Sequence, residues 1–267
     1  AQMSFVRRLV LAVAALLAVA LPAEHAYAQP ASPFYVAVTW NQPRAHFLDN
    51  AFNELSSFSL NDPNPNGVGA SATLIYSGHF SNSSIVAYNY AGVEQFRFSD
   101  AARLSNLQGL AYTGAEVAAA SGGDTHFFDA LTGAYTRSFA NSGSTVEGLA
   151  LHSGLLWELG DQIIGRNLAT GATVTSFANT AANCVFGGTG LASGGAGALA
   201  IACENGAWYR VSDVDGSVLA TGNNGLDMYG LTTISAATVV PEPASIVLMA
   251  IGLGALGGVT ARRRRSA

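Results

Sequence analysis

The sequence predicts an all-β fold, a β-propeller of five four-stranded blades, and two markers with a common period carry this prediction. The first marker is a glycine triplet that opens an apolar strand and returns with a period of roughly 40 residues. The copies are Gly109-Leu110-Ala111, Gly148-Leu149-Ala150, Gly190-Leu191-Ala192 and Gly230-Leu231-Thr232, and a degenerate copy, Gly69-Ala70-Ser71, lies one period before the first.

The second marker is a large apolar residue late in each unit. Ser138-Phe139-Ala140-Asn141 returns one period later as Ser176-Phe177-Ala178-Asn179. The whole series, in step with the glycine triplets, is Phe58, Phe98, Phe139, Phe177 and Leu219. Because two independent markers share one period, they indicate a repeated structural unit.

Each unit consists of four short predicted strands, and residues 109–139 show them most clearly. The strands cover residues 109–112, 115–121, 125–129 and 134–139. Glycines such as Gly114, Gly122 and Gly133 stand at the reversals, where hairpins require a positive φ. Four strands in about 40 residues make one propeller blade.

The two ends of the repeat region are predicted to complete one blade together. Residues 34–40, 45–50 and 53–60 supply three strands without an inner one, and residues 230–236 supply an inner strand alone. Their pairing closes a ring of five blades and removes the exposed edge of an open sheet. An open stack of repeats and a lectin-like β-sandwich remain as alternatives.

The repeat unit resembles the blades of NHL and YVTN-type propellers. Those blades also begin with a Gly-Leu/Ile-Ala strand and carry an Asp-x-x-x-Gly hairpin late in the unit. Residues 129–133 match this hairpin pattern, and residues 167–171 match it with Asn in place of Asp. The resemblance implies a fold but not a function.

The N-terminal segment, residues 1–28, is predicted to be a signal peptide. Arg7 and Arg8 precede an apolar stretch over residues 9–21, and Ala26-Tyr27-Ala28 offers small residues to a signal peptidase, with cleavage before Gln29. We expect Ala1 and Gln2 to be extra residues ahead of a start at Met3. The propeller domain is then expected over residues 29–240.

The C-terminal segment, residues 241–267, has three parts. Pro241-Glu242-Pro243 is followed by an uncharged, mostly apolar run over residues 244–261, and then by the cluster Arg262, Arg263, Arg264 and Arg265. A helix over this run spans roughly 27 Å, close to the thickness of the hydrocarbon core of a bilayer. The arginines fix the orientation because basic residues stay on the cytoplasmic side. A permanent C-terminal anchor is the alternative.

This three-part tail resembles the PEP-CTERM sorting signal of Gram-negative bacteria that make exopolysaccharide. The resemblance implies export across the inner membrane, transient anchoring through a transmembrane helix, and recognition by an exosortase that cuts near the Pro-Glu-Pro triplet. It also implies delivery to the cell surface or the extracellular biofilm matrix.

The middle of the chain is acidic and lacks lysine. Between the two targeting segments, six arginines stand against fifteen acids, so this part carries a net charge of −9. Such a surface does not suit phosphate backbones, which argues against nucleic acid as a partner. Cys184 and Cys203 are predicted to form a disulfide because export places them in an oxidising compartment, with two buried free thiols as the alternative.

Four acids in predicted loops are candidates for one face of the propeller. If the strand register is right, Asp124, Glu147, Asp161 and Glu204 approach one side of the face on which the inner strands begin. Clustered carboxylates suit a hard cation such as calcium, although acids also occupy turns because turns face water. No other cofactor is expected.

Aromatic residues near these loops suggest sugar stacking, by Trp40, Trp157, Trp208, Tyr209 and Tyr229, although Trp157 and Trp208 lie in predicted strands and suit core packing better. His46, His79, His126 and His152 form no metal-binding spacing, and a catalytic group assembled from distant blades would not be visible in the sequence. We therefore expect an exported, exosortase-processed protein that acts as a non-enzymatic binding or structural propeller, with a polysaccharide as candidate ligand. The alternative is a secreted propeller hydrolase or lyase acting on sugars or lactones.

Overall fold

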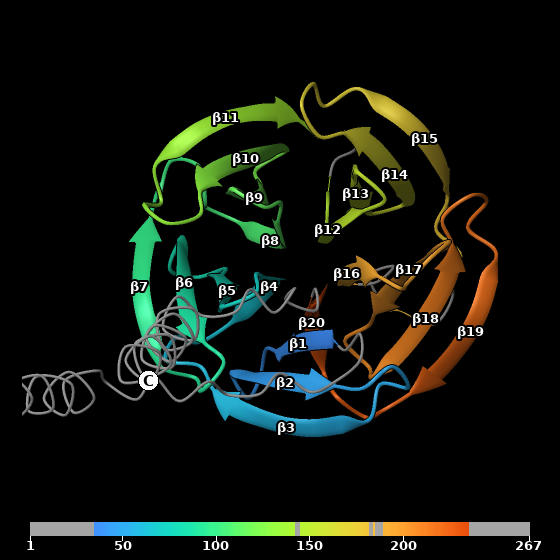
Figure 1. Cartoon of the computed structure of the whole chain (residues 1–267), viewed down its shortest axis with the longest axis horizontal. Coiled ribbons are helices and arrows are strands. Elements are labelled where there is room, and N and C mark those ends of the chain that lie inside the picture. The colour runs from blue at the N-terminus through green and yellow to red at the C-terminus, as the bar shows by residue number, and fades with distance from the viewer. Residues whose placement is uncertain (1–34, 142–144, 182–183, 185–188, 235–267) are drawn as a thin grey trace, which may run out of the picture. The chain divides into compact units, whose positions relative to one another are not determined.

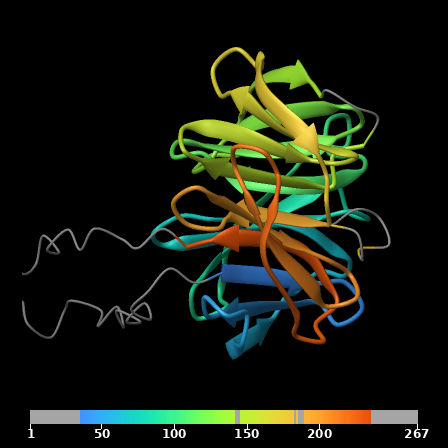
Figure 2. The same ribbon diagram turned by 90° about the vertical axis from the view of Figure 1, so that its right-hand side faces the viewer.

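The computed structural model describes residues 35–141, 145–181, 184 and 189–234. Within these ranges, five antiparallel four-stranded sheets surround a central axis as the blades of a propeller (Figure 1). The predicted five-bladed β-propeller is thereby confirmed. A side view shows that the blades span the same thickness of the ring, so the strand ends define two opposite faces (Figure 2).

The strands of each blade follow the chain from the innermost to the outermost, except that the first blade takes its inner strand from the end of the repeat region. From inside to outside, the blades are β20 (Met228–Thr233), β1 (Tyr35–Thr39), β2 (Arg44–Leu48) and β3 (Glu54–Ser59); β4 (Pro65–Ala70), β5 (Leu74–His79), β6 (Ser84–Asn89) and β7 (Glu94–Ser99); β8 (Leu107–Tyr112), β9 (Glu116–Ser121), β10 (Asp124–Asp129) and β11 (Tyr135–Ala140); β12 (Gly148–His152), β13 (Leu155–Leu159), β14 (Gln162–Asn167) and β15 (Thr173–Ala178); β16 (Gly190–Ser193), β17 (Ala198–Ala202), β18 (Ala207–Ser212) and β19 (Val218–Asn223).

The ring closes as the sequence predicts, because β20 pairs antiparallel with β1. Tyr35 lies opposite Thr233, and Thr39 lies opposite Met228. The observed inner strand begins slightly before the predicted range. In the blade of β8–β11, the strand bounds differ only slightly from the predicted ranges 109–112, 115–121, 125–129 and 134–139.

The glycine triplet marks the place where neighbouring inner strands approach most closely. A Cβ atom added to Gly190 would lie 2.6 Å from the backbone nitrogen of Leu231 in the next inner strand. At Gly148 and Gly109 an added Cβ would lie 2.9 Å from the backbone of the following blade, and Gly230 faces Gly67 in the same way. The copy of the triplet in the blade of β4–β7 is therefore Gly67-Val68-Gly69, and the predicted copy, Gly69-Ala70-Ser71, is wrong by two residues, because Ala70 ends its inner strand as Tyr112 ends the next one. Glycine recurs here because a side chain would push the inner strands apart.

The phenylalanine series marks a second contact between blades. Gly92, Gly133, Gly171 and Gly216 each stand in the outer hairpin of a blade, and an added Cβ would collide with Phe58, Phe98, Phe139 and Phe177, respectively, of the blade before. Each of these glycines also has a positive φ, between 70° and 79°. Glycine is therefore needed at this turn for two reasons, because the backbone has a positive φ and because a side chain would collide with the neighbouring phenylalanine ring.

The predicted continuation of this series at Leu219 is wrong. Strand pairing places Gly222, not Leu219, at the position of Phe177, and Leu219 is 58% exposed. Trp208 lies over Gly222 and stacks on Phe52 of the first blade with ring centroids 4.6 Å apart. The closing seam is therefore packed by a tryptophan from the third strand of its blade instead of a phenylalanine from the fourth.

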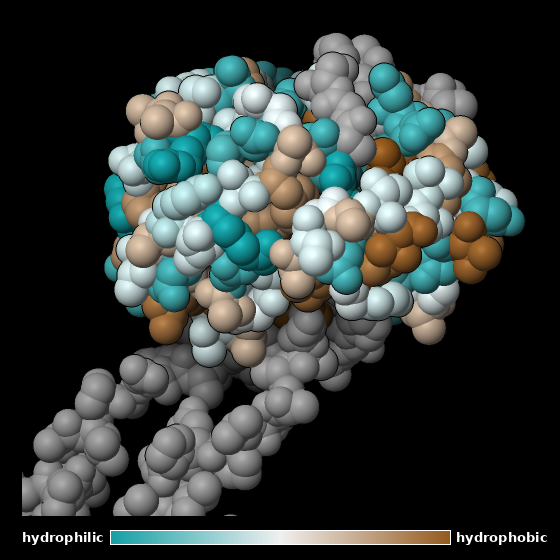
Figure 3. Space-filling view, turned by 90° about the horizontal axis from the view of Figure 1, so that it is seen from above, coloured by the Kyte–Doolittle hydropathy of each residue, from teal (hydrophilic) through white to brown (hydrophobic). Residues whose placement is uncertain are grey.

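The outer strands β7, β11, β15 and β19 largely alternate between half-buried and exposed residues, whereas the second strand of each blade is almost wholly buried. Seen from the side of β11 and β15, the rim carries hydrophobic side chains scattered among hydrophilic ones (Figure 3). The predicted signal peptide (1–28) and sorting tail (241–267) lie outside the described residues. In the part of the chain that the structure describes, no helix has the length and hydrophobicity needed to cross a bilayer.

Candidate functional site

The five inner strands run in the same direction along the axis, so each face of the propeller gathers equivalent strand ends. One face collects the residues that precede or begin the inner strands, among them Gln108, Glu147, Thr189 and Asp227. The opposite face collects the last residues of the inner strands, which are Ala70, Tyr112, His152, Ser193 and Thr233. Each face holds one group of side chains that could act on a ligand.

The first group, the acidic end, consists of Glu147, Glu204 and Asp227, all half-buried. Burial raises the pKa of Glu147, and the negative charge of Glu204 raises it further. Burial also raises the pKa of Asp227, where Glu204 adds to the effect and a hydrogen bond from Asn41 opposes it. Glu204 therefore lies within electrostatic reach of both other acids.

Aromatic rings stand beside the acidic end. The rings of Trp40 and Tyr229 have centroids 5.2 Å apart, and the centroids of Trp40 and Phe80 lie 5.7 Å apart. All three are half-buried. Burial raises the pKa of Tyr229, and the negative charges of Asp227, Glu204 and Glu147 raise it further, which ties the rings to the acids.

The Asn41 amide belongs to the same surface, because its Nδ2 donates to Asp227 Oδ2 over 2.6 Å. Gln108 Nε2 similarly donates to Glu147 Oε1 over 3.3 Å. Carboxylates, amides and half-buried rings are the groups that hold neutral, hydroxyl-rich molecules. The acidic end therefore presents carboxylates, amides and aromatic rings on one surface.

Of the four predicted acids, Glu147 and Glu204 approach each other. Asp124 begins β10, where its charge acts on His126, and Asp161 is exposed in the turn between β13 and β14. The described interactions do not connect Asp124 or Asp161 with the acidic end. Among the described residues, no group of three His, Cys, Asp or Glu side chains is arranged to hold a metal ion.

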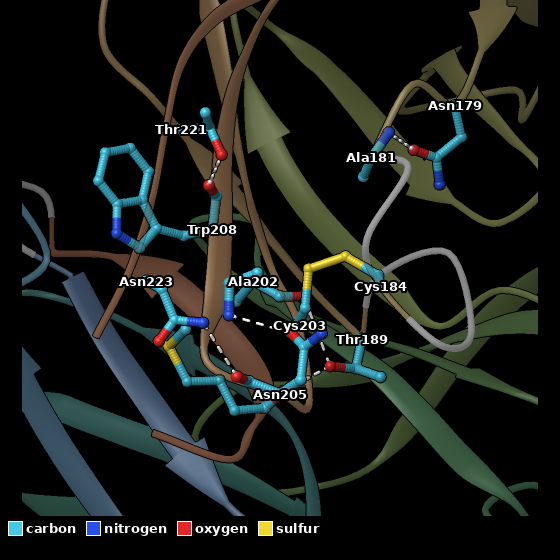
Figure 4. Close-up of a disulfide and its surroundings, with 12 residues drawn as sticks. Asn179, Ala181, Cys184, Thr189, Ala202, Cys203, Asn205, Trp208, Thr221 and Asn223 are labelled. Carbon is cyan, nitrogen blue, oxygen red and sulfur yellow. Dashed lines mark hydrogen bonds between the residues drawn. A yellow bond between two sulfur atoms is a disulfide. The ribbon is translucent and has the colours of Figure 1, made fainter. Parts of the chain in front are cut away.

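A disulfide braces this face of the fifth blade. The structure joins Cys184 to Cys203, with Cα atoms 5.2 Å apart (Figure 4). Cys184 lies before β16, and Cys203 follows β17 directly, next to Glu204 in the β17–β18 hairpin. Cys203 is fully buried. The Thr189 hydroxyl donates to the carbonyl oxygen of Met228, so the loop before β16 is also tied to the first residue of β20.

Trp157 and Tyr209, two of the predicted sugar-stacking residues, are buried in the core at 2% and 5% exposure. Trp157 also donates from Nε1 to the carbonyl oxygen of His152. Trp208 packs in the closing seam. Only Trp40 and Tyr229 of the predicted five stand together beside the acidic end.

The second group is the His152 pocket, a cavity of about 390 Å³ on the opposite face. The last residue of every inner strand lines it, so it lies on the axis. Small side chains give it its volume, and its hydroxyl groups come from Tyr112, Ser153, Ser193, Thr232 and Thr233.

A hydrogen-bonded chain of three side chains runs along the wall of this pocket. Ser193 Oγ lies 2.8 Å from His152 Nδ1, and His152 Nε2 lies 2.9 Å from Asp213 Oδ2. The residues come from different blades, since His152 ends β12 whereas Ser193 and Asp213 belong to the blade of β16–β19. Sequence analysis missed Ser193 and Asp213. The position of Ser193, one repeat after His152 at the end of the next inner strand, was the available signal.

Comparison with solved structures gives only a distant likeness. The chain is similar to a structure described as U3-55K and to one described as the WD40 repeats of RRP9, each with 12% identity, a TM-score of 0.47 and 72% of this chain covered. The chain spans 61% and 60% of those two chains. A likeness this weak carries no argument, so the fold assignment rests on the strand pairing. No curated protein matches the chain.

Residues 239–265 match the PEP-CTERM protein-sorting motif. The matched range contains the Pro-Glu-Pro triplet and the four arginines, so the predicted sorting signal is confirmed, whereas the helix predicted over residues 244–261 lies outside the described residues. The motif implies export and membrane-anchored sorting in a Gram-negative bacterium. The chain therefore carries a PEP-CTERM sorting motif, the mark by which an exosortase recognises a protein, beyond a five-bladed β-propeller.

Proposed function

We propose that this is an exported, exosortase-processed protein of the cell surface or extracellular matrix whose propeller binds polysaccharide at the acidic end. The observation that carries the proposal is the Trp40–Tyr229 ring pair beside the Asn41–Asp227 hydrogen bond. Flat rings can contact the C–H face of a sugar while the carboxylate and amide hold its hydroxyls. The sorting motif supports the location, since it routes the protein through the envelope in which such polymers are assembled.

The raised pKa values of Glu147 and Asp227 support the same surface. Because these acids are partly desolvated and repel Glu204, hydroxyl donors from a neutral sugar would compensate for part of their lost hydration. A calcium ion would do the same by charge. Since no three acids form a metal-binding group among the described residues, calcium remains a secondary proposal.

Binding is tested with the exported protein on an array of bacterial polysaccharides. Trp40→Ala and Asp227→Asn should each weaken binding about tenfold or more, which is about 1.4 kcal/mol. Tyr135→Ala is a matched control, because Tyr135 is 40% exposed on the outer strand β11, where Arg103 lies over its ring. Equal losses in the control, or no binding by the parent protein to any polymer, would contradict the proposal.

Processing is tested by mass spectrometry of the protein recovered from the cell surface. A new C-terminus near Pro243 is the expected result, together with a new N-terminus at Gln29. Replacing Glu242 within the triplet by Ala should leave the unprocessed chain in the inner membrane. A surface form that still ends in the arginine cluster would contradict exosortase processing.

A further inference from the structure

At the His152 pocket, a serine, a histidine and an aspartate are linked by hydrogen bonds, and these are the side chains of a catalytic triad. The pocket lies on the face opposite the proposed binding surface. We propose that this pocket hydrolyses short-chain carboxylic esters, with Ser193 as nucleophile, His152 as general base and Asp213 as the positioning residue. The supporting geometry is the Ser193–His152–Asp213 chain of hydrogen bonds, at 2.8 and 2.9 Å, on the wall of a cavity of about 390 Å³.

The hydrogen-bond partners fix the tautomer of the imidazole. A carboxylate only accepts hydrogen bonds, so Asp213 Oδ2 requires the proton on His152 Nε2. His152 Nδ1 is then the lone-pair nitrogen, and it faces the Ser193 hydroxyl. This is the arrangement in which a histidine can take a proton from serine, with the two ring nitrogens exchanged relative to the usual order.

Burial supports the role of Asp213 as the positioning residue. The His152 side chain is 5% exposed and that of Asp213 is 16% exposed, so water competes little for their hydrogen bond. Asp213 does not line the cavity, whereas His152 and Ser193 do. Thr233 donates from Oγ1 to the carbonyl oxygen of Ser193 over 2.6 Å, which fixes the backbone that carries the nucleophile.

Ser153 is a second serine beside the same imidazole. Its Oγ lies 3.1 Å from His152 Nε2, the nitrogen that Asp213 also engages, and the residue is exposed. Because Nε2 carries the proton, it cannot accept one from Ser153. Ser153 is therefore not expected to be the nucleophile, although its oxygen is as close to the ring as that of Ser193 would need to be.

The reaction balances with water as the only co-reactant. Ser193 Oγ attacks the ester carbonyl carbon, its proton passes to His152 Nδ1, and the carbonyl π electrons move to oxygen. Collapse of this intermediate breaks the bond to the alcohol oxygen, which takes the proton from Nδ1. Water then repeats the sequence on the acyl-serine, giving the carboxylic acid and restoring Ser193. Alanines 70, 111, 150 and 192 around the cavity leave room for a short acyl group.

The test uses the intact exported protein with two probes, a fluorophosphonate and p-nitrophenyl acetate. The fluorophosphonate should modify Ser193, as located by peptide mass spectrometry, and the ester should be hydrolysed with a burst of one p-nitrophenol per chain. Ser193→Ala and His152→Gln should lower hydrolysis at least about 100-fold, and Asp213→Asn should lower kcat more than it raises KM. Tyr135→Ala, on the outer strand β11 and outside the pocket lining, should stay within about twofold of the parent.

A purely structural latch between the two blades would give a different result. It predicts lower melting temperatures for the Ser193, His152 and Asp213 variants but no modified serine in the parent protein. An unmodified Ser193 in the folded parent overturns the proposal, whatever the variants do. Modification of Ser153 in place of Ser193, or unchanged hydrolysis by a folded Ser193→Ala variant, overturns it equally.

Discussion

The two ends of the propeller axis are built from the same repeat but carry opposite chemistry. The acidic end gathers Glu147, Glu204 and Asp227 beside half-buried aromatic rings, and a disulfide braces it. The His152 pocket is lined by small and hydroxyl-bearing residues and is organised by hydrogen bonds alone. The residues between the two ends, the Gly-Leu-Ala segments, are nearly the same in every blade. This contrast suggests that packing near the axis restricts the middle of each inner strand and leaves its ends free to vary.

The largest expected effect comes from changing that restricted middle. Gly190→Ala would place a methyl group 2.6 Å from the Leu231 backbone nitrogen, and neither strand can move without disturbing the ring. We expect a loss of about 3 kcal/mol in the free energy of unfolding, measured by chemical denaturation, with both ends affected.

Gly122→Ala is the control for this substitution. Gly122 has a φ of 63° but open space around its Cβ position, so only the backbone conformation opposes a side chain. Its cost should be about 1 kcal/mol. If both glycine variants were equally stable, close packing at the axis would not explain the triplet.

Removing the disulfide should affect one end more than the other. In Cys184→Ser with Cys203→Ser, the loss of the cross-link that closes the loop between these cysteines should cost about 2–4 kcal/mol. Polysaccharide binding at the acidic end should weaken with it, because Glu204 follows Cys203 directly. Hydrolysis in the His152 pocket of the folded variant should persist. Equal loss at both ends would show that the ends do not behave independently.

The sequence predicted what repeats and missed what does not. The blades and their closure were visible because close approach at the axis requires glycine once in each unit, and the outer hairpins of four blades require glycine against a ring. Leu219 was misplaced because Trp208, on the third strand of its blade, makes the contact between blades that a phenylalanine on the fourth strand makes elsewhere. The fourth strand carries Gly222 at that position, and Trp208 lies over it. Periodicity carries no information about such an exchange.

The candidate sites were predicted only in part for a related reason. Glu147 and Glu204 were placed together by the strand register, but Asp227 was overlooked because it precedes the strand that closes the ring. His152, Ser193 and Asp213 meet across long separations in the sequence with no local motif. Equivalent positions in different repeats become neighbours only around the axis, so comparing the last residues of the inner strands was the way to find them.

A smaller effect on stability should follow from breaking the contact between blades at the pocket. His152→Asn removes partners of both Ser193 and Asp213, and we expect a loss of about 2 kcal/mol in the free energy of unfolding. His126→Asn is a suitable comparison, because His126 is half-buried in β10 and should cost less. Thermal melting of both variants distinguishes them. A His152 variant as stable as the His126 variant would mean that the hydrogen-bonded chain adds little to the joint between these blades.

The smallest expected effect is the pH dependence of the acidic end. The raised pKa of Glu147 means that the folded state holds its proton more tightly than the unfolded state. Stability from this group is therefore greatest below the unfolded pKa and falls as pH rises through the folded pKa. Glu147→Gln should raise the melting temperature slightly at pH 7, which corresponds to a gain of less than about 1 kcal/mol in the free energy of unfolding. The substitution should make no difference near pH 3.

Glu94→Gln provides the opposite sign on the rim. Hydrogen bonds from Arg97 and Asn61 lower the pKa of Glu94 to about 2, so its contribution is present above the unfolded pKa and disappears as pH falls toward 2. This variant should melt lower than the parent at pH 7 and converge with it in acid. The two variants thus diverge in opposite directions from one parent curve, because burial and the charge of Glu204 disfavour the ionised form of Glu147, whereas hydrogen bonds from Arg97 and Asn61 favour that of Glu94. If Glu147→Gln instead melted lower at pH 7, the hydrogen bond from Gln108 to the Glu147 carboxylate would outweigh the burial of that carboxylate and its repulsion from Glu204. The acidic end would then be a hydrogen-bonded structure that needs no ligand to balance its charge.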